Sequence, residues 1–83
     1  METVETELLR LVNQVRRNKR QPELSSLTGD PHLRADWHFD SLDLAELTVR
    51  IEERFGIDVF EAGVVNRWEE IRTRVTRHAA GRK

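Results

Sequence analysis

The sequence contains no cysteine and only three histidines. Disulfides, thiolate zinc sites and iron–sulfur clusters are therefore excluded, and the scattered histidines lack the spacing of a metal site. Long apolar runs are also missing, so we expect no membrane-spanning segment. The amino terminus METVETELLR is acidic and polar, unlike the basic and then apolar start of a secretory signal. These absences predict a cytoplasmic protein with no metal site and no membrane attachment.

The length of 83 residues allows one small domain. If the chain were divided into two domains, each would bury too little surface to form its own core. Hydrophobic residues make up 37% of the chain and charged residues 35%, which is enough apolar material for one modest core. We expect a single domain over residues 1–83, with a core over about residues 3–78 and a basic tail over about residues 79–83.

The formal net charge is -1, but the two signs are separated along the chain. Residues 40–55 carry five acids and two bases, whereas residues 67–83 carry six bases and two acids. A balance near zero argues against nonspecific nucleic-acid binding. The basic carboxyl-terminal segment keeps one remote alternative open, a small helical interaction or nucleic-acid-binding module.

Helical periodicity accounts for most of the chain. Apolar residues at steps of three and four predict helices over residues 3–18, 42–55 and 67–80, with Ser41 and Asn66 as N-caps of the second and third. A shorter helix is expected around residues 60–65. Residues 21–40 contain both prolines and no sustained period, which predicts a long loop. No strand pattern competes, so the predicted fold is an all-α bundle of three main helices and one short helix.

The predicted loop carries large apolar side chains that we expect to anchor it on the core. They are Leu24, Leu27, Leu33, Trp37 and Phe39.

The run Asp40-Ser41-Leu42-Asp43-Leu44 at the start of the second predicted helix resembles the signature of the acyl and peptidyl carrier protein family. The resemblance includes the preceding Leu33-Arg34-Ala35-Asp36 and the helix order of the chain from about residue 3 to 78. It implies a small four-helix bundle that is not an enzyme and holds acyl or aminoacyl groups as thioesters. The resemblance also implies that the thioester forms on a 4'-phosphopantetheine arm, which a phosphopantetheinyl transferase would attach to Ser41.

The predicted position of Ser41 at a helix start also suits a phosphate. Unpaired backbone N–H groups and the positive end of the helix dipole favour an anion there. The alternative is that Ser41 only caps the helix, as most such serines do. A catalytic serine is not supported, because no Gly-x-Ser-x-Gly elbow is present.

The resemblance further implies a partner-binding face on the second helix, which loading enzymes and synthases would contact transiently while the carrier stays a monomer. Charge at such a face speeds encounter more than it adds affinity. The alternative is an ordinary solvated helix face. The residues implied are Asp40, Leu42, Asp43, Glu46, Val49, Glu52 and Glu53, of which Leu42 and Val49 fall outside the core stripe.

Several positions depart from the family pattern. Trp37-His38 stands where a leucine and a glycine are usual. Histidine adopts a positive φ less readily than glycine, so the sequence does not fix the backbone conformation just before Ser41. Arg50 places a cation on the acidic face, and the carboxyl-terminal segment is basic. These departures favour a stand-alone acyl carrier of a specialised, polyketide-like pathway, with an aminoacyl or peptidyl carrier loaded by an adenylating enzyme as the alternative.

Overall fold

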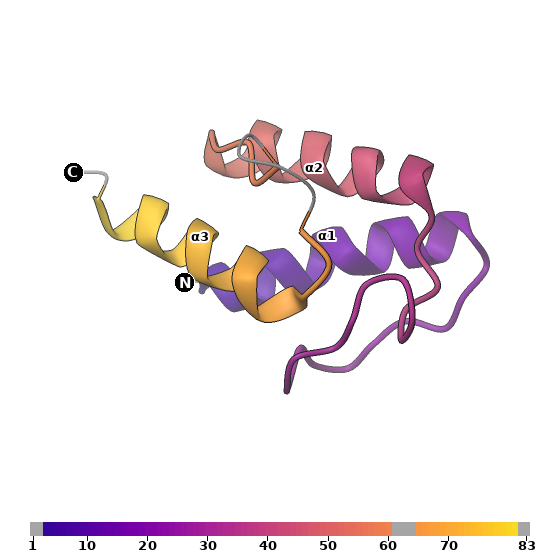
Figure 1. The fold of residues 1–83 in the computed structure, drawn as a ribbon. Coiled ribbons are helices and arrows are strands. Elements are labelled where there is room, and N and C mark those ends of the chain that lie inside the picture. Colours follow the sequence, from indigo (N-terminus) through magenta and orange to yellow (C-terminus); the bar gives the residue numbers. More distant parts are fainter. Residues whose placement is uncertain (1–2, 61–64, 82–83) are drawn as a thin grey trace.

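The computed structural model describes residues 3–60 and 65–81 and shows three helices in these ranges: α1 (Val4–Asn18), α2 (Ser41–Phe55) and α3 (Trp68–Gly81) (Figure 1). The described residues form no strand beyond a single bridge between His32 and Arg67. The all-helical prediction and its three main helices are therefore confirmed. The short helix expected around residues 60–65 falls mainly on residues outside the described ranges.

Helix α1 is amphipathic, as its sequence pattern predicts. Leu8, Val12 and Val15 are buried along its inner face. Thr3 caps its amino terminus by accepting a hydrogen bond from the Thr6 amide. At the other end the Arg20 and Gln21 amides donate to Arg17 and Arg16 carbonyls, which is the Schellman arrangement.

Helix α2 buries the stripe that the sequence assigned to its core face. It ends at Gly56, whose φ of 77° is the left-handed conformation that glycine adopts without strain. The buried residues of the stripe are Leu44, Leu47, Ile51 and Phe55.

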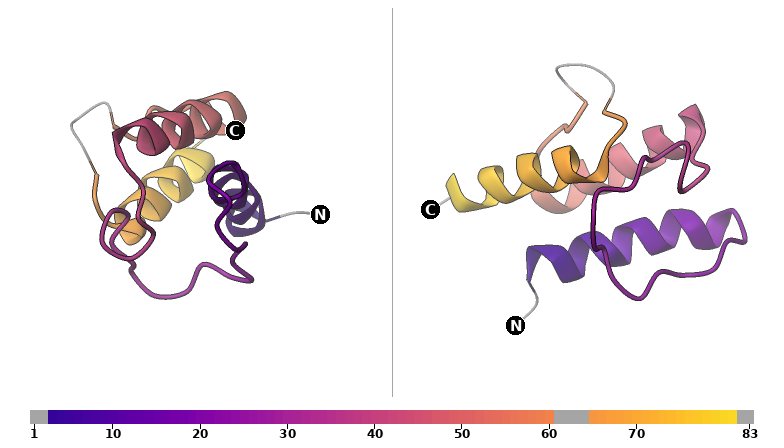
Figure 2. Two further views of the ribbon diagram at one scale, coloured as in Figure 1. Left: turned by 90° about the vertical axis from the view of Figure 1, so that its right-hand side faces the viewer. Right: turned by 60° about the horizontal axis from the view of Figure 1, so that its bottom comes forward.

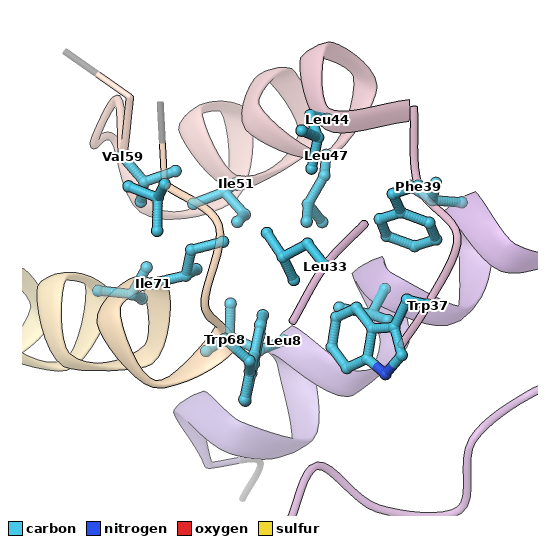
Figure 3. Packing of buried hydrophobic residues seen from close by; sticks show 14 of the residues in the cluster. Leu8, Leu33, Trp37, Phe39, Leu44, Leu47, Ile51, Val59, Trp68 and Ile71 are labelled. Carbon is cyan, nitrogen blue, oxygen red and sulfur yellow. The ribbon is translucent and has the colours of Figure 1, made fainter. Parts of the chain in front are cut away.

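Residues 19–40, called here the connection, join α1 to α2 and are fixed by apolar anchors. Leu33 lies at the centre of the core, with side chains from all three helices around it (Figure 3). The Trp37 ring lies 5.6 Å from that of Phe39 and 5.4 Å from that of Trp68, centroid to centroid. Leu27 is also buried and Leu24 is half-buried, so the predicted anchoring is confirmed.

The connection also builds the start of α3. The Asp30 carboxylate accepts a hydrogen bond from the Glu69 amide at 3.0 Å, and the Pro31 carbonyl accepts one from the Trp68 amide. A residue distant in sequence thus takes the capping role that we assigned to Asn66, whose carbonyl instead accepts from the Leu33 amide at 2.7 Å.

The three helices surround a common interior, and the connection closes one side of it (Figure 2). Trp68, Ile71 and Val75 are the buried contribution of α3. Within the described ranges no helix is both long and apolar enough to cross a membrane.

Candidate functional site

The amino terminus of α2 is closed by a capping box made of two aspartates. The Asp40 carboxylate accepts from the Asp43 amide and the Asp43 carboxylate accepts from the Asp40 amide, both at 2.9 Å. The prediction that Ser41 is the N-cap is therefore wrong. Asp40 is the cap because its partner three residues on can return the hydrogen bond, and Ser41 becomes the first residue of the helix.

The capping hydrogen bonds also affect the acidity of Asp40. Its pKa is lowered below the ordinary value, first by the hydrogen bond from the backbone amide of Asp43. A side-chain hydrogen bond with Asp43 and the positive charge of Lys19 lower it further. The Asp40 carboxylate is thus held in its charged form next to Ser41.

Lys19 ties this terminus to the end of α1. Its ammonium lies 2.5 Å from the Asp43 carboxylate and donates to the His38 carbonyl at 2.7 Å. Asp43 is only 7% exposed, so its carboxylate is used inside the protein and does not lie on the outer face of α2 where we expected it.

His38 adopts a φ of 58°, in the left-handed region that favours glycine. The His38 amide donates to the Arg34 carbonyl at 3.0 Å, and Lys19 holds its carbonyl. These two hydrogen bonds fix a conformation that costs a non-glycine residue about 1–2 kcal/mol. The backbone before Ser41 is thus held in a positive φ by contacts from Arg34 and Lys19.

Ser41 is exposed and meets one cation from the connection. The Arg34 guanidinium donates to Ser41 Oγ at 3.0 Å. A shallow depression of about 140 Å³ begins beside the hydroxyl and is lined by Arg34, Ser41, Leu44, Ala45 and Phe60. The hydroxyl is therefore open to another molecule and lies beside a positive charge and a small apolar surface.

The outer face of α2 combines apolar and acidic side chains. Leu42 is 78% exposed and Val49 is 52% exposed, as their positions outside the core stripe predict. Glu52 and Glu53 are exposed on the same helix. A second depression is lined by Leu42, Ala45, Glu46, Val49, Arg50 and Glu53.

Glu46 is partly neutralised. It accepts hydrogen bonds from Asn18 at 2.8 Å and from Arg50 at 3.0 Å, and Arg50 in turn donates to Gln14. The cation that departs from the family pattern is thus held against α1 and reduces the acidity of this part of the face.

Two arginines of α3, Arg72 and Arg74, are engaged with acids of the protein itself. Arg72 pairs with Glu5 and Glu69, and Arg74 pairs with Glu70 and donates to the Val59 carbonyl. The Arg72 pKa is raised, chiefly by its hydrogen bond with Glu69. This pairing reduces the positive charge that α3 could offer to nucleic acid. The described part of the chain also holds no group of three or more His, Cys, Asp or Glu side chains arranged for a metal ion.

The fold and site thus define a small helical domain that presents one exposed serine at a helix start. Residues 20–62, slightly more than half of the chain, match the family model described as "Phosphopantetheine attachment site". The chain therefore belongs to the phosphopantetheine-binding family, whose domains are in general non-catalytic carriers with a covalently attached 4'-phosphopantetheine cofactor. No curated protein and no solved structure showed significant similarity to the chain.

The residues around Ser41 fit such a group. A phosphodiester is a monoanion, and the site offers it the Arg34 guanidinium, the start of α2 and an exposed hydroxyl. The sequence indicated the hydroxyl and the helix start, but not Arg34 as its neighbour. Arg34 lies beside Ser41 because of the path that the connection takes over the core. Helical periodicity and capping signals in the sequence do not predict this path.

Proposed function

We propose that Ser41 is the attachment site of 4'-phosphopantetheine in this carrier. All three serines of the chain lie within residues 20–62, but Ser25 and Ser26 are on the connection. The observation that carries the proposal is the exposed Ser41 hydroxyl at the first residue of α2, within hydrogen-bond distance of a cation.

Attachment joins Ser41 Oγ to the phosphorus of the phosphopantetheine half of coenzyme A. The pyrophosphate bond of coenzyme A breaks, adenosine 3',5'-bisphosphate leaves, and the hydroxyl proton passes to a base of the phosphopantetheinyl transferase. Arg34 only donates, so Oγ acts as the acceptor in their hydrogen bond. The hydroxyl hydrogen and a second lone pair therefore remain for the base and for attack on phosphorus.

The test is incubation with coenzyme A and a promiscuous phosphopantetheinyl transferase, followed by intact mass measurement. Wild type should gain the mass of one phosphopantetheine group. Ser41→Ala should gain none while its helical circular dichroism stays close to wild type, and Ser26→Ala should be modified like wild type. Modification of Ser41→Ala would contradict the assignment.

We further propose that the cargo is an acyl intermediate of a specialised, polyketide-like pathway. The apolar depression beside Ser41 and the departures at Trp37, His38 and Arg50 support this proposal. Mass spectrometry of the protein isolated from its native host would identify the thioester. An amino acid on the arm would favour an aminoacyl carrier loaded by an adenylating enzyme.

The partner face that we propose is the outer side of α2, formed by Leu42, Glu46, Val49, Glu52 and Glu53. The site's geometry leaves Asp43 out of this face because its carboxylate is buried. Asp40 lies at the edge as the cap of α2. An exposed apolar pair beside two acids suits transient contact with a transferase or synthase that presents a basic rim around an apolar patch.

Two kinds of substitution test this face, with transferase and loading rates as the measurement. Glu53→Lys should slow both reactions at low salt, and the defect should shrink as salt screens the attraction. Leu42→Ala should slow them by an amount that salt changes little. Arg77→Glu on α3 is the matched control and should leave both rates unchanged. A rate defect in Arg77→Glu alone would place recognition on α3 instead.

A further inference from the structure

Arg34 approaches Ser41 from a different segment of the chain. Its guanidinium is exposed, yet it lies 3.0 Å from the serine oxygen across seven positions of sequence. An unrestrained surface arginine loses considerable side-chain entropy on holding one such contact. Such a contact is favoured only where the backbone that carries Arg34 is itself fixed.

The backbone of Arg34 is held from both sides. Its amide donates to His32 Nδ1 at 3.2 Å, and its carbonyl accepts from the His38 amide at 3.0 Å. His32 Nδ1 also accepts from the Ala35 amide at 3.1 Å, and the His32 carbonyl accepts from Asp36 and Trp37. The turn is thus tied to a single histidine.

Burial on both sides of Arg34 adds to this restraint. Leu33 is fully buried and Trp37 is 6% exposed, so the turn cannot lift from the core without exposing both side chains. The Arg34 side chain therefore extends toward Ser41 from a pre-organised base.

The other charges at the start of α2 are already engaged. The Asp40 carboxylate accepts a hydrogen bond from the Asp43 amide, and the Lys19 ammonium donates to the Asp43 carboxylate and to the His38 carbonyl. Among the described residues, Arg34 is the cation hydrogen-bonded to Ser41 Oγ. A planar guanidinium matches two phosphate oxygens better than an ammonium does.

We propose that Arg34 is a positioning residue for the phosphodiester of the arm. The proposal rests on Ser41 being the attachment site. After attachment, Arg34 donates to the non-bridging oxygens of the phosphodiester, which lie two bonds beyond the oxygen that it contacts in the unmodified protein. This offsets the repulsion from Asp40 and biases the start of the arm toward the depression formed with Leu44, Ala45 and Phe60.

Phosphorus-31 NMR of the fully modified protein tests this directly. Four proteins are modified to completion with excess transferase: wild type, Arg34→Gln, Arg34→Lys and the matched control Arg77→Gln. The chemical shift of the phosphodiester in each folded protein is compared with that of the same protein unfolded in urea. In Arg34→Gln the phosphodiester signal should move toward its unfolded position, whereas Arg77→Gln should match wild type. Arg34→Lys should fall between them. Added salt should shift the wild-type signal more than that of Arg34→Gln.

Thermal unfolding supplies a second measurement. The difference in Tm between modified and unmodified protein should be about 2–6 °C more favourable in wild type than in Arg34→Gln, as expected for one exposed charge pair in a domain of this size. If Arg34→Gln fails to fold, Arg34→Lys and the salt titration of wild type give the same comparison.

Identical phosphorus signals in wild type and Arg34→Gln would overturn the role of Arg34 and leave Ser41 as the attachment site. Folded Arg34 variants that cannot be modified at all would also overturn it, because Arg34 would then serve the transferase and not the arm. Absence of any mass gain in wild type would overturn both proposals.

Discussion

Replacing Asp43 should destabilise the protein strongly, although it stands in the run of acids that resembles a partner-binding face. Its carboxylate accepts a hydrogen bond from the Asp40 amide and pairs with Lys19 at 2.5 Å, and its side chain is 10% exposed. Asp43→Ala removes the returning half of the capping box and leaves Lys19 without its carboxylate.

The expected magnitude follows from these two losses. Loss of the hydrogen bond from the Asp40 amide costs about 1 kcal/mol. Removing one partner of a fully buried ion pair costs about 3–5 kcal/mol, but Lys19 is 25% exposed and keeps the His38 carbonyl, so we expect about 1–2 kcal/mol here. The free energy of unfolding should fall by about 2–3 kcal/mol in total, which lowers Tm by about 10–20 °C in a domain of this size.

Urea denaturation followed by circular dichroism measures this loss. Asp43→Asn retains an acceptor for the Asp40 amide but not the charge, so it should lose about 1–2 kcal/mol, the ion-pair share of the effect. Glu53→Ala on the exposed side of the same helix is the control and should stay within about 0.5 kcal/mol of wild type. An Asp43→Ala protein as stable as that control would refute the reasoning.

Three further predictions concern the connection and its junction with α2. Trp37→Ala should lower the free energy of unfolding by about 3–5 kcal/mol in urea denaturation, and in Trp68→Phe the remaining Trp37 should emit as a buried indole. A solvent-exposed emission would contradict that packing. His38→Gly should raise the free energy of unfolding by about 0.5–1 kcal/mol because φ is 58°, whereas His38→Ala should bring no gain. The pKa of Asp40 is lowered in the folded state. The contribution of its charge to the free energy of unfolding is therefore complete above the pKa of the unfolded state and disappears as pH falls through the lower pKa of the folded state. The stability difference between wild type and Asp40→Asn should therefore shrink in acid, and a difference that stays constant down to pH of about 2 would contradict this.

Local sequence signals predicted the helices well because each helix carries its own information. The stripes of α1 and α2 and the glycine after Phe55 depend on residues within a few positions of one another. The exposure of Leu42 and Val49 follows from the same periodicity. Such features need no knowledge of the folded path.

The cap of α2 was predicted wrongly because two good cap residues are adjacent. Asp40 and Ser41 are both favoured at an N-cap, so propensity alone does not separate them. The spacing from Asp40 to Asp43 allows the reciprocal hydrogen bonds of the capping box and decides the position. That spacing was visible in the sequence and could have been used.

Contacts between distant segments could not be predicted from local patterns. Lys19 meets Asp43, and Asp30 caps the start of α3, only because the connection takes one path across the helices. The same holds for Arg34 and Ser41. The sequence indicated Ser41 as the candidate attachment residue, but the charges that surround its hydroxyl depend on the folded path.

The connection therefore does more than join two helices. Its buried anchors Leu33 and Trp37 fix the turn that carries Arg34, and its last residues set the left-handed backbone at His38 before the capping box. Helix α2 supplies the serine, whereas the connection supplies the charge beside it. Loosening the connection should consequently disturb the environment of Ser41 before the helices unfold, because the anchors that hold Arg34 are also those that hold the connection on the core.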